Sequence, residues 1–124
     1  MSTRFYVVSI WAEDVPACTH FYRDVLGLSL LPHLGSRPHF GVNGTYLVIL
    51  KGQPVPAQHP HPERFPIFAL SVDDLDEMVA RLKDHGLAMP WGIETDADGR
   101  WVMFHDPGGN LIELAQSRQM HNNH

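Results

Sequence analysis

The sequence of 124 residues is 44% hydrophobic and carries a formal net charge of −5, which fits a globular protein with room for one core. Its nine Lys and Arg residues are scattered, and no apolar run approaches the ~18 residues of a membrane span, so neither nucleic acid nor a membrane is expected as a partner. Cys18 is the only cysteine, which excludes an intrachain disulfide, and with the lack of an apolar leader segment it indicates a cytoplasmic protein.

An internal repeat organises the chain, and its first copy begins with a strand predicted over Phe5–Trp11. Asp14 is placed to cap a helix whose apolar residues recur at three- and four-residue steps as far as Leu26, and Gly27 is placed to end it. Asn43-Gly44 favours the positive φ angles of a tight hairpin turn. The three strands predicted after the helix are Leu28–Pro32, Pro38–Val42 and Thr45–Lys51.

The second copy repeats this order after a connector that is rich in proline and favours extended geometry. A strand predicted at Pro66–Val72 leads into a helix that Asp74 is placed to cap and Gly86 to end. Leu75, Met78, Val79 and Leu82 give this helix one apolar face. The three strands predicted after it are Ala88–Ile93, Arg100–His105 and Asn110–Gln116.

Two motifs carry a resemblance to a known family. The helix of the first copy closes on FYRDVLGL at Phe21–Leu28, and the second copy closes on DPGGNLIEL at Asp106–Leu114. In this order the motifs resemble those of the glyoxalase/bleomycin resistance protein/dioxygenase family, the vicinal oxygen chelate superfamily. The resemblance implies an α+β fold of two tandem βαβββ modules that form an incompletely closed barrel around a ligand cavity, in a homodimer. The implied single domain has module one at about 4–52, the connector at 53–65, module two at about 66–117 and a polar tail at 118–124.

The resemblance also implies where a metal would bind, because metal-dependent members hold a divalent ion with His and Glu side chains. The matching positions are Val7, Ile67, the neighbours Ile49 and Leu50, and Glu113. Valine, isoleucine and leucine have no lone pair to offer a metal. Glu113 alone falls short of the roughly three protein ligands of a catalytic site. We therefore expect neither a metal nor another cofactor.

Three histidines leave a rebuilt metal site open as an alternative. His33, His39 and His105 fall on or beside predicted strands that could line the cavity. No spacing among them predicts a set of ligands, and His39 could point to either side of its strand. For His105, which directly precedes the turn at Asp106, exposure at the end of a strand is the simpler interpretation.

Strand alternation indicates which side chains reach the cavity. Phe5, Val7, Ser9 and Trp11 share one face of the first strand, and Val7 occupies an implied ligand position, so this face is expected to line the pocket. Packing in the barrel interior is an equal alternative for Val7 and Ile67, and for the three tryptophans it is the simpler interpretation. The residues predicted to contact the ligand are Phe5, Val7, Ser9, Trp11, Ile49, Ile67, Ala69, Trp101, Leu111 and Glu113.

Glu113 is predicted to carry the chemistry of this otherwise apolar pocket. Burial would raise its pKa, which suits a catalytic general base or acid, or the anchor of a cationic ligand; a solvent-facing glutamate is the alternative. The sequence favours a metal-independent binding protein of the bleomycin-resistance type, acting in antibiotic resistance, for a hydrophobic or aromatic small molecule that can be cationic. The alternative is a glyoxalase- or dioxygenase-like lyase, isomerase or oxygenase that uses Glu113 as a general base or a rebuilt metal site.

Overall fold

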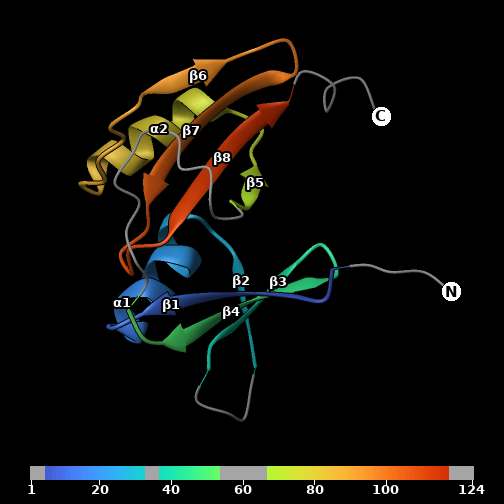
Figure 1. Cartoon of the computed structure of the whole chain (residues 1–124), viewed down its shortest axis with the longest axis vertical. Helices are drawn as coiled ribbons and strands as arrows, with labels where there is room; N and C mark the ends of the chain where they lie inside the picture. Colours follow the sequence, from blue (N-terminus) through green and yellow to red (C-terminus); the bar gives the residue numbers. More distant parts are fainter. Residues whose placement is uncertain (1–4, 33–36, 54–66, 118–124) are drawn as a thin grey trace, which may run out of the picture. The chain divides into compact units, whose positions relative to one another are not determined.

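The computed structural model describes residues 5–32, 37–53 and 67–117, which fall into two compact units (Figure 1). Each unit contains one copy of the βαβββ pattern, and this confirms the predicted α+β fold. The rest of the proline-rich connector after Gln53 and the tail after Ser117 lie outside the described residues. The first unit comprises Met1–Val55 with the short segment Pro107–Asn110, and the second comprises Pro56–Asp106 with Leu111–His124.

The first unit is built on a mixed four-stranded sheet, here called sheet A, in the strand order β1-β4-β3-β2. β1 runs parallel to β4, and the other neighbouring strands are antiparallel. β1 and β2 are therefore the edge strands, and the sheet does not close on itself. The elements in chain order are β1 (Val7–Ala12), α1 (Val15–His20), the π-helix η1 (Phe21–Val25), β2 (Ser29–Leu31), β3 (His39–Val42) and β4 (Thr45–Lys51).

The first helix begins as predicted and then changes type. Asp14 Oδ1 accepts the backbone N–H of Ala17 at 3.0 Å, which caps α1. Beyond α1 the chain widens into η1, where the N–H of Leu26 donates to the carbonyl of Phe21, five residues earlier, at 3.0 Å. Apolar residues at three- and four-residue steps do not distinguish a π-helix from an α-helix. The sequence therefore predicted one continuous α-helix.

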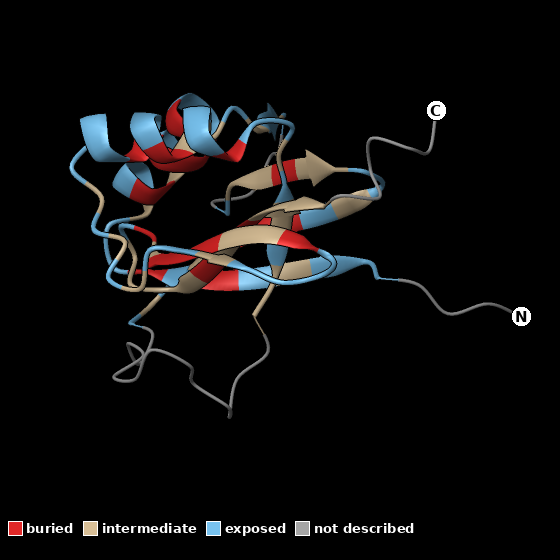
Figure 2. Cartoon of the chain, turned by 90° about the horizontal axis from the view of Figure 1, so that it is seen from above, coloured by how far each residue is buried: buried red, intermediate tan, exposed pale blue. Residues whose placement is uncertain are grey.

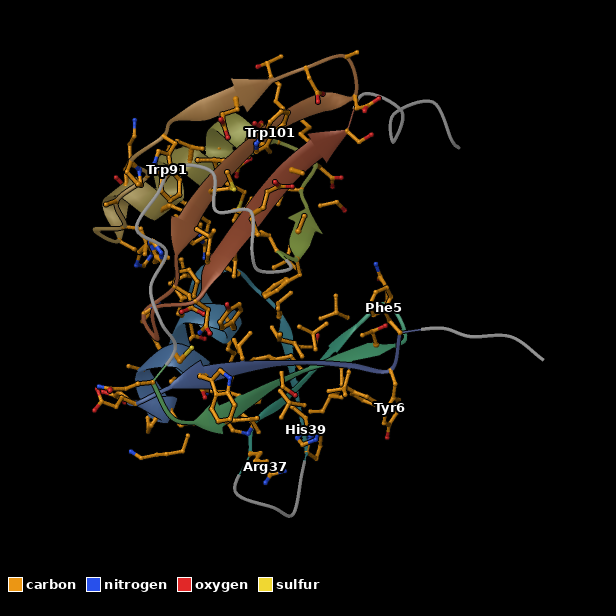
Figure 3. All side chains as sticks on the ribbon, viewed as in Figure 1. Phe5, Tyr6, Arg37, His39, Trp91 and Trp101 are labelled. Atoms are coloured by element: carbon orange, nitrogen blue, oxygen red, sulfur yellow. The ribbon has the colours of Figure 1, made fainter. Side chains whose placement is uncertain are left out.

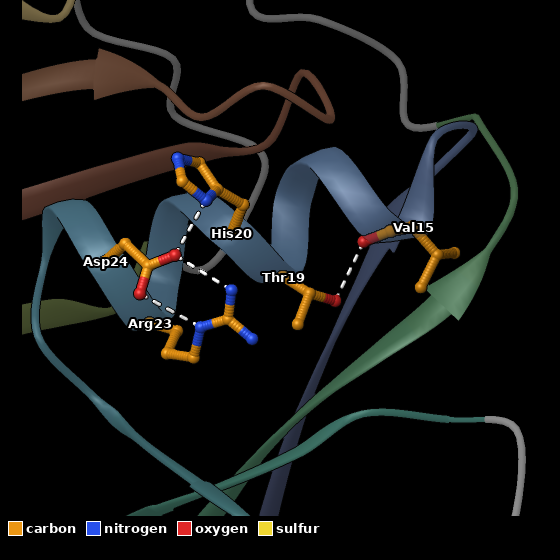
Figure 4. A network of polar contacts seen from close by, with 5 residues as sticks. All are labelled: Val15, Thr19, His20, Arg23 and Asp24. Carbon is orange, nitrogen blue, oxygen red and sulfur yellow. Dashed lines mark hydrogen bonds and ion pairs between the residues drawn. The ribbon is translucent and has the colours of Figure 1, made fainter.

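The outer side of this helix carries a polar network (Figure 4). Asp24 accepts two hydrogen bonds from the Arg23 guanidinium, at 2.9 and 2.8 Å, and its Oδ2 lies 2.6 Å from His20 Nδ1. The Arg23 guanidinium lowers the pKa of Asp24. Thr19 Oγ1 donates to the carbonyl of Val15 at 2.8 Å. Because the ionic side chains are exposed, we expect the network to contribute little to stability.

The turn between β3 and β4 forms as the sequence predicted. Asn43 and Gly44 have φ angles of +50° and +81°, the left-handed values that a type I′ hairpin turn needs at both positions. This tight turn fixes the register, so that Val42 pairs with Thr45 and Phe40 pairs with Leu47. Each strand of the hairpin then presents alternate residues to the helix.

The core of the first unit lies between the helix and one face of sheet A. The buried positions of the helices lie on the side that is turned toward strands (Figure 2). Packing of these side chains removes apolar surface from water, which is the main favourable contribution to folding. The buried apolar residues on this face are Ile10, Ala12, Phe40, Leu47 and Ile49 from the sheet and Cys18, Phe21, Tyr22 and Val25 from the helix. Val48, on the opposite face of β4, is also buried.

The second unit repeats this arrangement on a second mixed sheet, sheet B, in the order β5-β8-β7-β6. β5 runs parallel to β8, and the remaining pairs are antiparallel. No helix in the described part of the chain has the length and apolar character needed to cross a membrane. The elements are β5 (Ala69–Ser71), α2 (Leu75–Asp84), β6 (Ile93–Thr95), β7 (Gly99–His105) and β8 (Leu111–Ser117).

α2 is capped by Asp74, whose Oδ1 accepts the N–H of Glu77 at 3.1 Å, as the sequence predicted. Its apolar face buries Leu75, Val79 and Leu82. The sheet buries an alternate set of residues on the face that contacts this helix. These residues are Val102, Phe104, Ile112 and Leu114.

The strand predicted at Ala88–Ile93 was misplaced. β6 occupies Ile93–Thr95, and the preceding residues form a turn in which the N–H of Gly92 donates to the carbonyl of Met89 at 3.1 Å. Gly92 has a φ of +65°, which is incompatible with a strand at that point. The shift matters for function because it places Glu94, rather than a turn residue, within the sheet.

Candidate functional site

Each sheet has a second face, opposite its helix, which we call its open face. On sheet A, Val7, Ser9 and Trp11 of β1 pair in register with Tyr46, Val48 and Leu50 of β4. Paired residues of neighbouring strands point to the same side, so these six side chains share the open face. Trp11 is 46% exposed and Val7 is 41% exposed. The predicted grouping of Val7, Ser9 and Trp11 on one face agrees with this register.

Two residues predicted at this face lie elsewhere. Ile49 pairs with Ile10, is 1% exposed and belongs to the helix-facing core, so its assignment to the pocket lining is wrong. Its neighbour Leu50 has the orientation that was expected of Ile49, because consecutive strand residues point to opposite faces. Phe5 precedes β1, is 80% exposed and has no register with β4 (Figure 3).

His39 also lies on the open face of sheet A, in register with Val48. Its Nδ1 is 2.8 Å from the carbonyl oxygen of Arg37, and because a carbonyl only accepts, Nδ1 carries the proton (Figure 3). The imidazole also meets the Tyr46 ring edge-on, with centroids 6.2 Å apart. His33, the other histidine considered in this unit, lies outside the described residues.

On sheet B the open face brings together most of the remaining predicted residues. Glu113 pairs with Ala69 on β5 and with Met103 on β7. Leu111 pairs with His105. Trp101 pairs with Ala115, two residues from Glu113 on the same side of β8. Ile67 precedes β5, two residues before Ala69, and is half-buried.

Glu113 is half-buried on this face, and its pKa is raised. Burial is the main cause, since loss of water disfavours the charged carboxylate, and the negative charge of Glu94 raises it further. This direction agrees with the prediction from the sequence. The second carboxylate was not predicted.

Glu94 joins the site through Trp101. The indole Nε1 donates a 2.8 Å hydrogen bond to Glu94 Oε2, across the β6–β7 pair in which the two residues stand in register. This bond to a charged acceptor fixes the orientation of the Trp101 ring. Sequence reasoning missed Glu94 because the predicted strand ended at Ile93. A strand shifted to follow Gly92 would have placed Glu94 opposite Trp101.

His105 closes one end of this face. Its ring lies 6.2 Å from the ring of Trp91, at an interplanar angle of 59°. Trp91 is half-buried and comes from the turn before β6. The open face of sheet B thus combines two carboxylates, an oriented indole, an imidazole and the buried thioether of Met103.

The residues at the implied metal positions do not fit a divalent ion. Val7 and Ile67 supply no donor atom, and neither do Val48 and Leu50, which flank the third position on the open face of β4. Among the described residues, no group of three or more His, Cys, Asp or Glu side chains is arranged to hold a metal. Glu113 is left as a carboxylate that shares this face with Glu94 and Trp101.

The chain belongs to the Glyoxalase/Bleomycin resistance protein/Dioxygenase superfamily, whose family model matches residues 4–114. Among curated proteins it is 30% identical over 117 residues to the uncharacterized protein YaeR of Escherichia coli (strain K12), covering 86% of this chain and 91% of that one. Among solved structures it resembles TnmS3, an antibiotic binding protein from Streptomyces sp. CB03234, at 29% identity and a TM-score of 0.71, with 94% and 97% of the two chains covered. It also resembles the oxidase ChaP-H2, at 27% identity and a TM-score of 0.71, with 94% of each chain covered.

Proposed function

We propose that the protein binds a cationic aromatic small molecule, independently of any metal, on the open face of sheet B. The observation that carries this proposal is the group formed by Glu113, Glu94 and Trp101. A carboxylate that is partly removed from water, beside a second carboxylate, gains most from a cation placed next to it. The indole offers a face for stacking and for a cation–π contact.

The apolar surroundings favour an aromatic ligand over a small inorganic cation. Ala69, Leu111 and Met103 flank Glu113 on this face and contribute no charge. Such a surface excludes water around the ligand and strengthens the attraction between the ligand charge and the carboxylates. The similarity to TnmS3, an antibiotic binding protein, supports an antibiotic as the ligand and a role in tolerance to an antibiotic.

The open face of sheet A is proposed as a second, apolar ligand-contacting surface. Val7, Ser9 and Trp11 belong to it, with Tyr46 and Leu50 on the neighbouring strand. Trp11 and Tyr46 are large aromatic side chains that stay partly exposed, which is the usual state of rings that stack on a ligand. Phe5 and Ile67, at the edges of the two faces, complete the proposed set. A homodimer is proposed as the assembly, to be measured by light scattering coupled to size exclusion.

The binding test uses a pair of probes that have the same shape and differ in charge. N-methylquinolinium is a bicyclic aromatic cation, and 1-methylnaphthalene is its neutral counterpart. Calorimetry should show clearly tighter binding of the cation, and Glu113→Gln and Glu94→Gln should each weaken it about 10-fold, as expected for loss of a charge-assisted contact of ~1.5 kcal/mol. Glu77→Gln, which removes an exposed charge from the same unit, is the control. Equal affinity for the two probes, or no binding across a wider panel of aromatic cations, would overturn the proposal.

A second candidate function is catalysis, and the raised pKa of Glu113 favours it because a carboxylate with a raised pKa is a stronger base. The reaction would be that of a metal-free lyase or isomerase with Glu113 as general base, or of an oxygenase with a rebuilt metal site. Elemental analysis of protein purified without chelators separates these forms. Stoichiometric iron, nickel or zinc would support the metal-dependent form and contradict the metal-independent proposal above.

A further inference from the structure

On the edge of β1 that does not pair with β4, the backbone of Trp11 is hydrogen-bonded to the side chain of Asn110. Trp11 N–H donates to Asn110 Oδ1 at 3.1 Å, and Asn110 Nδ2 donates to the Trp11 carbonyl at 2.6 Å. A carboxamide presents an N–H donor and a C=O acceptor on the same side, as one extended residue does toward the edge of its strand. Asn110 therefore pairs with Trp11 as a residue of an additional strand would.

The backbone of β1 leaves these two groups available for Asn110. The carbonyls of Tyr6 and Ala12 accept the N–H groups of Tyr46 and Gly52, so the even positions of this segment bond to the β4 side. The polar groups of the odd residue Trp11 point to the opposite edge. An unpaired edge is where a strand frays or binds another chain.

Gly108 permits the close approach of this turn. A Cβ atom at Gly108 would lie 2.5 Å from the carbonyl oxygen of Trp11 and 3.0 Å from the Cβ of Ala12, so any larger residue would push the turn away. The segment Pro107–Asn110 accordingly belongs to the first compact unit, although the sequence places it between β7 and β8. From the sequence it was interpreted only as a turn.

The indole of Trp11 is confined as well. A Cβ atom at Gly52 would lie only 2.6 Å from Cε3 of the Trp11 ring, so the ring rests on the backbone of Gly52. The two hydrogen bonds with Asn110 fix the Trp11 backbone, and with it the direction of the Cα–Cβ bond. Backbone and ring together give Trp11 one orientation on the open face of sheet A, while the side chain stays 46% exposed.

We propose that Asn110 is a positioning residue that holds Trp11 ready to contact the ligand. The contact of Trp11 with a ligand rests on the function proposed above; the positioning of its ring does not. Ordering a large side chain before binding lowers the entropic cost of association, so loss of Asn110 weakens binding without removing a ligand contact.

The first experiment measures the position of Trp11 without any ligand. In protein labelled with 5-fluorotryptophan, the fluorine signal of Trp11 is assigned with Trp11→Phe. Asn110→Asp keeps an acceptor for the Trp11 N–H but sets an oxygen against the Trp11 carbonyl, and Asn110→Ala removes both bonds. We expect the Trp11 signal to shift or broaden in both variants, with the signals of Trp91 and Trp101 unchanged. Asn43→Asp, the same chemical change at an exposed turn of the same unit, is the control.

The second experiment measures the affinity for N-methylquinolinium. Asn110→Ala should weaken binding about 3- to 10-fold in the wild-type background and should have no further effect in Trp11→Ala, because the two residues then act through one contact. An unchanged Trp11 signal, or an equal loss of affinity in the Trp11→Ala background, would overturn the proposal. If the wild-type protein binds no aromatic cation, the proposed function fails, and the fluorine signal alone decides whether Asn110 positions Trp11.

Discussion

The open faces of the two sheets arise from the same βαβββ pattern, but they differ in charge. On sheet A the paired positions of β1 and β4 hold Val7, Ser9, Trp11, Tyr46, Val48 and Leu50, none of which is a carboxylate. On sheet B the corresponding face holds Glu94 and Glu113 beside an oriented tryptophan. The buried positions of the helix-facing sides, in contrast, are apolar in both units.

This difference shows which constraints the repeat imposes. A strand that packs against a helix must alternate, so both helix-facing sides are fixed by the need for a core. The open faces carry no such requirement, and their residues can serve binding. The charge on sheet B and the apolar aromatic character of sheet A are therefore where we expect substitutions to change function rather than folding.

The largest expected effect separates the two faces of a single strand. Ile49 is 1% exposed on the core side of β4, and its neighbour Leu50 is half-buried on the open side. Ile49→Ala should lower the free energy of unfolding by ~2–5 kcal/mol, and Leu50→Ala by about 1 kcal/mol. Urea denaturation of both variants measures this. Equal losses of stability in the two variants would mean that Leu50 is packed as tightly as Ile49, and that this face of sheet A is not available to a ligand.

A smaller effect is expected at Trp101, where the two faces differ in polar contacts. Trp101→Phe keeps an aromatic ring but removes the N–H that donates to Glu94. A hydrogen bond to a charged acceptor contributes ~1.5–3 kcal/mol when it is shielded from water. Because this bond is half-buried, its loss in Trp101→Phe should lower the free energy of unfolding by about 1.5 kcal/mol. The same variant should bind N-methylquinolinium several-fold more weakly. Trp91→Phe serves as the matched control. An unchanged affinity in Trp101→Phe would show that the Glu94 bond does not orient the binding ring.

The charge of Glu113 should appear as a pH dependence of stability. Burial raises the pKa of Glu113 in the folded state, so the folded protein binds this proton more tightly than the unfolded chain does. Its contribution to stability is complete below the pKa of an unfolded glutamate, ~4.3, and is lost as pH rises through the raised pKa of the folded protein.

Glu113→Gln should therefore have a somewhat higher Tm than the wild type at pH 7 and no such advantage at pH 4. Glu94→Gln should lower the pKa of Glu113, because the charge of Glu94 is one cause of the upward shift. A carbon-detected NMR titration of the Glu113 carboxyl measures this directly. If Glu94→Gln leaves the pKa of Glu113 unchanged, the two carboxylates do not interact, and this result would contradict the proposal that they form one binding site.

Sequence reasoning predicted most of the fold because the fold depends on local signals. Asp14, Asp74 and the Asn43-Gly44 turn each act through their own neighbours, so their types and spacing suffice. The candidate site was predicted less completely. Ile49 was assigned to the wrong face because alternation is reversed by an error of one residue, and Glu94 was missed because β6 begins only after Gly92.

Asn110 shows the remaining limit of sequence reasoning. Its contact with Trp11 joins residues 99 positions apart, and no local pattern specifies which strand edge a side-chain amide will reach. The glycine that allows the approach, Gly108, is also compatible with an ordinary turn. Long-range polar contacts of this kind appear only once the chain is folded.

The smallest effect is expected on the outer side of the first helix, away from both open faces. Asp24 accepts hydrogen bonds from Arg23 and faces His20, yet all three side chains are exposed and screened by solvent. Asp24→Asn should leave the Tm and the affinity for N-methylquinolinium unchanged within error at moderate salt. A loss of affinity in this variant would mean that binding responds to the charge of the whole protein, and not to the carboxylates of sheet B, so the contrast between the two faces would lose its functional meaning.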